Sequence, residues 1–211
     1  MSLPKADRIA LVIVAIAAVS GMGLTLTRPY LAPDAEPIYT FDTPEQETLF
    51  ELVGSEFGAF IQPMVDISWY DGPFANLEYG RRVYVVNCIH CHGSDGGADT
   101  PTAALLTPPP RNFSLGAIVH QSTPAGSPPL REDLRRTVLE GVPSTSMSEF
   151  SALTEEERNA AVDYVWYLLI RGSVWTRGLD LLDSLEPQQA FVEAMRIEKE
   201  RWTDPNRREA Q

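Results

Sequence analysis

The sequence predicts an all-α protein: a helical domain of ordinary size, an N-terminal transmembrane helix and extra flanking helices. Apolar residues recur at helical spacing in several segments between residues 44 and 202, and residues typical of helix starts and stops bound these segments. No β-α-β pattern surrounds the two cysteines, and no internal repeat is found. With 211 residues, 44% of them hydrophobic, the chain has enough apolar surface for one compact core and some extensions.

Residues 1–27 are predicted to anchor the protein in a membrane. Residues 9–27 carry no charge and nearly reach the ~20 residues that cross a bilayer, while Lys5 and Arg8 before them favour a cytoplasmic start. A cleaved signal peptide ending near Ser20 and a buried core helix are the alternatives. Both leading interpretations export residue 28 onward. We therefore expect a single-pass inner-membrane protein whose main domain lies on the periplasmic side.

Residues 28–72 are predicted to form an acidic, Pro-rich tether followed by an amphipathic helix. Arg28 is the only basic residue in this segment. Thr43 is a suitable N-cap, Pro44 suits the first helical position, and Gln46 completes a possible capping box. The apolar face of the helix consists of Leu49, Val53, Phe57 and Phe60. This face is expected to pack on the neighbouring domain or to dock a partner subunit.

Residues 73–172 are predicted to form the main domain, and residues 173–211 a C-terminal helical extension. Within the main domain, helices are expected over residues 76–87 and 131–140, the second stopped by Gly141. Thr154 and Glu157 form a capping box for a third helix that is expected to end at Gly172. A final amphipathic helix is expected over residues 187–202 of the extension.

The charge of the chain excludes one class of partner. A formal net charge of −12 disfavours nucleic acid, whose phosphates require clustered Lys and Arg side chains. The acidic segment is suited either to meeting a basic protein surface or simply to solubility.

Both cysteines lie in the run Cys88-Ile89-His90-Cys91-His92, which has the C-x-x-C-H spacing of c-type haem attachment. Two thiols one turn apart can form thioethers with the two vinyl groups of a porphyrin, and the following imidazole can reach the iron. A thioredoxin-like redox pair and a zinc site are the alternatives, although His120 is the only further His or Cys ligand for zinc. His90 is given no role.

The wider sequence resembles the single-haem class I cytochrome c domain over about residues 73–172. The resemblance rests, in the order that the family uses, on Gly80 and Tyr84, CIHCHG, Pro108 to Phe113, Gly141-Val142-Pro143, Met147 with Phe150, and Tyr164 with Val165. It implies a helix crossing in which Gly80, Tyr84 and Tyr164 are core residues.

The resemblance also implies how the haem is held. Cys88 and Cys91 are expected to bind one haem c covalently, with His92 and Met147 as the axial iron ligands. Ser148 stands where the family usually has Pro, and His120, Met64 and Met195 are the other candidates for the distal ligand. The Pro110 carbonyl is expected to accept a hydrogen bond from His92. Arg111 is expected either to pair with a haem propionate or to be a solvated surface charge. Phe113 is expected to lie near the haem.

With both axial positions filled, the predicted function is outer-sphere electron transfer and not catalysis, so no catalytic residue is assigned. The expected partners are the membrane and redox proteins: a quinol-oxidising complex, a terminal oxidase or another cytochrome. The alternatives are a haem enzyme and a gas or redox sensor, each of which needs an open sixth coordination site.

Overall fold

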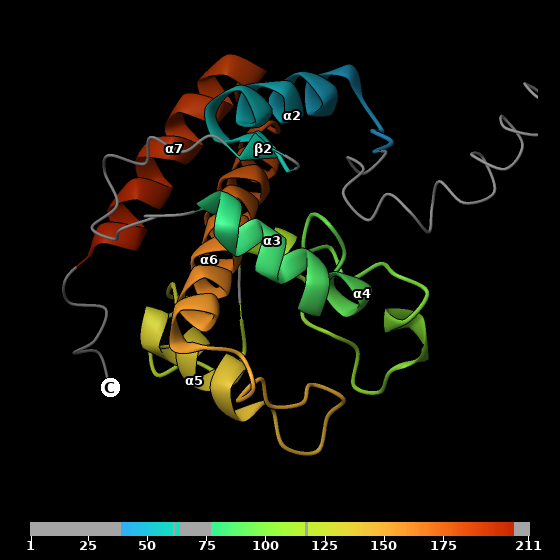
Figure 1. Cartoon of the computed structure of the whole chain (residues 1–211). Coiled ribbons are helices and arrows are strands. Elements are labelled where there is room, and N and C mark those ends of the chain that lie inside the picture. Colours follow the sequence, from blue (N-terminus) through green and yellow to red (C-terminus); the bar gives the residue numbers. More distant parts are fainter. Residues whose placement is uncertain (1–38, 61, 64–76, 117, 205–211) are drawn as a thin grey trace, which may run out of the picture. The chain divides into compact units, whose positions relative to one another are not determined.

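The computed structural model describes residues 39–60, 62–63, 77–116 and 118–204, and these are mostly helical (Figure 1). The prediction of an all-α fold holds there, apart from a short antiparallel pair in which Gly58 lies opposite Pro63. The elements are α2 (Pro44–Phe57), β1 (Gly58–Ala59), β2 (Gln62–Pro63), α3 (Leu77–Asn87), α4 (Ile89–His92), the 3₁₀ turns η1 (Ala103–Leu105) and η2 (Phe113–Leu115), α5 (Arg131–Glu140), α6 (Glu155–Leu181) and α7 (Pro187–Thr203).

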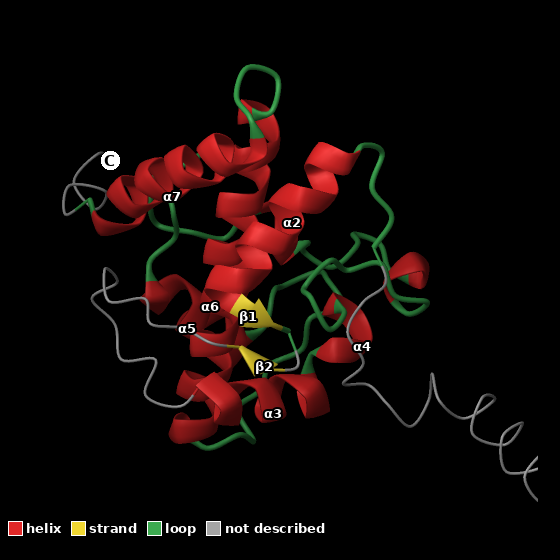
Figure 2. Cartoon of the chain, turned by 90° about the horizontal axis from the view of Figure 1, so that it is seen from above, coloured by secondary structure: helices red, strands yellow, loops and turns green. Residues whose placement is uncertain are grey.

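The long helix α6 is the centre of the fold, because α2, α3, α5, α7 and η2 all pack on it (Figures 1 and 2). The crossing of α3 and α6 depends on Gly80: a Cβ atom there would collide with the backbone carbonyl of Ala160. Beside the crossing, the rings of Tyr84 and Tyr164 lie with their centroids 5.0 Å apart. Gly80, Tyr84 and Tyr164 are therefore core residues, as predicted.

Helix α6 starts at its predicted capping box but does not end at Gly172, so that prediction is wrong. The helix continues to Leu181 because its second half has an apolar face to bury: Val174 is fully buried and Gly178 lies against the side chain of Leu49. Gly172 does not end the helix; it allows the close approach of the segment that contains Phe113. A Cβ atom there would lie 2.6 Å from the carbonyl oxygen of Phe113.

Helix α2 packs on the rest of the domain, which decides between the two alternatives for its apolar face. It begins after Thr43, whose side chain accepts a hydrogen bond from the Gln46 amide at 3.3 Å, as predicted. Leu49, Val53 and Phe57 are buried, and α2 contacts both α6 and α7. Phe60 is also buried, but it lies beyond the helix.

Helix α7 packs on both α6 and α2 and matches its predicted range to within a residue. Its Glu198 is fully buried and pairs with Arg177 of α6 at 3.2 Å and with Arg201 at 2.5 Å. The ring of Trp202 is buried edge-on against Trp166, with centroids 5.4 Å apart. Apolar packing and a buried ion pair together hold the extension on the domain.

The predicted anchor over residues 1–27 and most of the predicted tether lie outside the described residues. Within the described ranges, none of the helices combines the length and the apolar character that crossing a membrane requires.

Candidate functional site

Cys88, Cys91 and His92 share one tight turn at the end of α3. The amide of Cys88 donates to the carbonyl of Tyr84 at 2.7 Å, and the carbonyl of Cys88 accepts from the amides of Cys91 and His92 at 3.2 and 3.0 Å. Both cysteines are free thiols. The turn thus brings two sulfur atoms and an imidazole together without any long-range contact.

Burial controls the protonation state of the first thiol. Burial, with a smaller contribution from the neighbouring Cys91, raises the pKa of Cys88 to about 12. The burial of an anion without a positive partner is unfavourable, so Cys88 is a protonated thiol at neutral pH.

His92 is held on two sides in one orientation. Its Nδ1 atom lies 2.9 Å from the carbonyl oxygen of Arg111, and its ring stacks on that of Phe113 with a centroid distance of 4.5 Å and an interplanar angle of 11°. Because a carbonyl only accepts, Nδ1 carries the proton and Nε2 keeps its lone pair. Burial lowers the pKa of His92, an effect that the hydrogen bond to Arg111 partly offsets. The ring is therefore a neutral imidazole, as a metal ligand must be.

The carbonyl in this role belongs to Arg111, so the prediction of Pro110 is wrong by one residue. The register is set by Phe113, which must place its ring on His92 while its amide donates to the carbonyl of Gly96 at 2.7 Å. The carbonyl two residues before Phe113 then faces the imidazole. The Arg111 side chain is exposed.

The turn η2 that follows Arg111 is fixed by close backbone packing. The side chain of Asn112 caps it, accepting from the amide of Ser114 at 2.8 Å. Gly116, at φ +65°, touches α6: a Cβ atom there would lie 2.5 Å from Ser173. The segment that supplies the Arg111 carbonyl and the Phe113 ring to His92 therefore packs directly on α6.

Two further residues belong to the surroundings of His92 and were not predicted. The hydroxyl of Tyr39 donates to Oδ2 of Asp95 at 2.6 Å, and Oδ1 of Asp95 accepts from the amide of Gly97 at 2.8 Å. An aspartate before two glycines is a signal for such an Asx turn, so the role of Asp95 was accessible to sequence reasoning. Nothing in the sequence pairs it with Tyr39, because the two residues are far apart in the chain.

Met147 lies in a separate loop between α5 and α6. Its amide donates to Oγ1 of Thr145 at 3.1 Å and its carbonyl accepts from the amide of Val142 at 3.0 Å. The loop needs Gly141, which has φ +71° and whose Cβ atom would lie 2.6 Å from the Met147 carbonyl oxygen. The Met147 side chain is partly exposed.

The other candidates for a distal ligand differ in position. His120 is exposed on the segment after η2, and Met195 packs against the core from α7. Met64 lies outside the described residues.

The donor set fits a c-type haem. It supplies two thiols for thioethers, a neutral imidazole with a free Nε2 and a thioether side chain on another loop.

A match to a known protein family agrees with this fit. Residues 75–165 match the family model described as "Cytochrome C oxidase, cbb3-type, subunit III". A solved structure from the reducing HAO-like protein complex of Kuenenia stuttgartiensis is similar, with 43% sequence identity and a TM-score of 0.41. That match covers 42% of this chain and 40% of the other, so this chain spans less than half the length of that protein. No curated protein matches the chain.

Proposed function

Residues 75–165 form a cytochrome c domain of the single-haem type, and from this premise we propose that the protein carries single electrons through one covalently bound haem c. The cofactor supplies a reversible one-electron couple when it is bound. Cys88 and Cys91 attach it, and His92 and Met147 are the axial ligands. The sequence contains one pair of cysteines, which limits covalent attachment through two thioethers to one haem.

The observation that carries the proposal is the orientation of His92. A neutral imidazole whose Nδ1 donates to the Arg111 carbonyl keeps the lone pair on its other nitrogen, Nε2, for a metal ion. That hydrogen bond makes Nε2 a better donor and fixes the ring.

Filling both axial positions leaves no site for a substrate, which supports electron transfer over catalysis. The thioether of Met147 favours the reduced state and hence a moderately high potential. The protein then needs only to fix the ligands and to let a partner approach.

We further propose that the carrier is tethered to the inner membrane by residues 1–27, with its haem domain in the periplasm. The uncharged run over residues 9–27 and the basic residues before it support this topology. A tethered carrier serves partners in the same membrane, such as a quinol-oxidising complex, a terminal oxidase or another cytochrome. The matching family is described as an oxidase subunit, which supports a place as a redox subunit of a respiratory complex.

The test is the ferric absorption spectrum of the full chain, matured with haem, compared with that of Met147→Ala. The near-infrared sulfur-to-iron charge-transfer band is expected in the wild type and absent from the variant. Ser148→Ala is the matched control, because it changes the neighbouring residue in the same loop and keeps the thioether.

A second candidate function has one observation in its favour: the partly exposed Met147 sits in a loop where Ser148 replaces the proline of the family pattern. If Met147 does not hold the sixth position, a haem enzyme or a gas sensor is the better interpretation. Carbon monoxide binding separates the two functions. A firmly six-coordinate carrier binds it poorly, whereas an enzyme or sensor with an open site binds it readily.

A further inference from the structure

We propose that the two segments outside the family match, the stretch that begins at Tyr39 and the helix α7, are positioning elements for His92. They brace from two sides the loop that carries Arg111 and Phe113, through the hydrogen bonds Tyr39–Asp95 and Trp202–Ser173. The inference rests on the proposed function, because it takes His92 as the proximal iron ligand. It adds that residues remote from the motif set the strength of the His92 hydrogen bond and with it the potential.

The first brace runs from α7 through α6. Nε1 of the buried Trp202 donates to Oγ of Ser173 at 3.0 Å, and the hydroxyl of Ser173 donates to the carbonyl of Ile170 at 2.8 Å. Ser173 is the residue against which Gly116 of the η2 loop packs, with no space for a Cβ atom. Trp202 therefore fixes the surface on which η2 rests.

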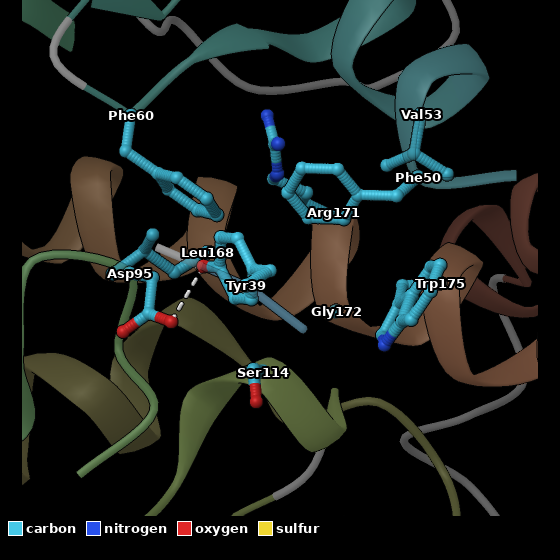
Figure 3. Close-up of a pocket in the computed structure, with 10 residues that line it drawn as sticks. All are labelled: Tyr39, Phe50, Val53, Phe60, Asp95, Ser114, Leu168, Arg171, Gly172 and Trp175. Carbon is cyan, nitrogen blue, oxygen red and sulfur yellow. Dashed lines mark hydrogen bonds between the residues drawn. The ribbon is translucent and has the colours of Figure 1, made fainter. Parts of the chain in front are cut away.

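The second brace runs from the N-terminal side through the loop after His92. The Tyr39 hydroxyl donates to Oδ2 of Asp95 (Figure 3). The other carboxylate oxygen accepts from the amide of Gly97. Between them, Gly96 accepts the amide hydrogen of Phe113 at 2.7 Å, and a Cβ atom on Gly96 would lie 2.9 Å from Cβ of Phe113. A change at Tyr39 is thus transmitted through one carboxylate to the residue stacked on His92.

A cavity lies beside the Tyr39–Asp95 hydrogen bond and reaches η2. It has a volume of about 70 Å³, and its walls include Tyr39, Phe60, Asp95, Ser114, Arg171 and Gly172 (Figure 3). Since Ser114 of η2 forms part of the wall, side-chain packing around the turn is incomplete there. The hydrogen bonds of Asp95 therefore act together with the close backbone contact between Gly172 and Ser114 in holding η2.

The consequence for His92 has a definite sign. The hydrogen bond from Nδ1 to the Arg111 carbonyl increases the basicity of the imidazole, and a more basic ligand stabilises the ferric state. When the loop is free to move, this bond weakens, so the reduced state gains. Loss of either brace therefore raises the reduction potential.

The experiment compares two variants of the haem-loaded full chain with a control. Tyr39→Phe removes only the hydroxyl that bonds Asp95, and Ser173→Ala removes the acceptor of Trp202. Tyr167→Phe is the control, because it also removes a buried hydroxyl from α6, one that donates to the Phe57 carbonyl at 3.1 Å and accepts from Arg171 at 3.2 Å. Redox titration against a reference couple is expected to show an equilibrium constant for reduction that rises on the order of two- to tenfold in the first two variants. It should not change in the control.

A potential that is unchanged in Tyr39→Phe and Ser173→Ala, or that shifts equally in Tyr167→Phe, would overturn the inference. Amide hydrogen exchange of Phe113 gives a second measurement that does not depend on haem: exchange should be faster in the first two variants and unchanged in the control. If the wild type lacks the spectrum of His and Met ligation, the proposed function fails. The exchange rate of the Phe113 amide still tests whether the two hydrogen bonds hold the loop of Arg111 and Phe113.

Discussion

The loop that orients His92, residues 111–116, contacts distant parts of the chain, whereas the loop that carries Met147 is held by its own neighbours in the sequence. Arg111 and Phe113 are held by α6 through Gly116 and by the Gly96 carbonyl. Among the described residues, the hydrogen bonds of residues 141–150 all remain within residues 137–153.

This difference teaches which ligand is expected to be rigid. A group that is held by several elements moves only when the domain moves, while a locally held loop opens at small cost. Under the proposed function, the imidazole of His92 is therefore the more rigid ligand and the thioether of Met147 the less rigid one. The four predictions below test this contrast, from the largest effect to the smallest.

Gly116→Ala is expected to have the largest effect, because it combines an unfavourable φ of +65° with a collision against Ser173. Urea denaturation should show a loss of about 3 kcal/mol or more in the free energy of unfolding. Gly126→Ala is the matched control: its φ is +85° but no atom lies within 4 Å of the added Cβ, so strain alone should cost about 1–2 kcal/mol. Equal losses in the two variants would mean that η2 does not press on α6.

Gly141→Ala tests the loop that carries Met147, again by adding a Cβ atom at a glycine with positive φ. The alanine would be strained at φ +71° and would press on the Met147 carbonyl, but the loop can shift, so we expect a smaller loss of about 2 kcal/mol. The near-infrared band of the haem-loaded protein should be lost while the ligation by His92 persists, which low-temperature electron paramagnetic resonance can measure. Retention of the band would show that the Met147 loop is more rigid than its bonds indicate.

Asp133→Asn tests the element that leads into the distal loop. Burial of Asp133 raises its pKa, but hydrogen bonds from Leu130 and Ser122 and the nearby Arg136 outweigh burial, so the pKa in the folded state is lowered. Its contribution is present above the unfolded value of about 4 and is lost as pH falls through the folded value. The variant should lose about 2 kcal/mol at pH 7, measured by denaturation, and its stability should converge with the wild type in acid. If the difference in stability between the variant and the wild type were as large below pH 4 as at pH 7, the result would contradict this prediction.

The smallest expected effect separates the loops most sharply. Thr145→Val removes the acceptor of the Met147 amide, and Asn112→Ala removes the cap of η2. Each should cost about 1 kcal/mol of stability. In the haem-loaded protein, however, only Thr145→Val should bind added imidazole more tightly, as followed by the visible spectrum. Tighter binding in both variants would remove the distinction between the two loops.

Most helices of this fold were predictable from local signals. The capping box at Thr154, the stop at Gly141 and the proline at residue 187 are decided by hydrogen bonds and steric limits of a few neighbouring residues. The C-x-x-C-H run was equally informative, since its chemistry needs only one turn of chain. The end of α6 was not predictable from Gly172, because glycine occurs both at helix ends and within helices at close backbone contacts.

The sequence by itself determined the helical class, the starts of its helices and the identity of the two thiols and the imidazole. The tertiary structure alone decided that the Arg111 carbonyl orients His92, that Asp95 meets Tyr39, and that Ser173 supports η2. These pairings join residues that are distant along the chain. They depend on which backbone segments touch on α6, and local propensity and spacing carry no information about such contacts.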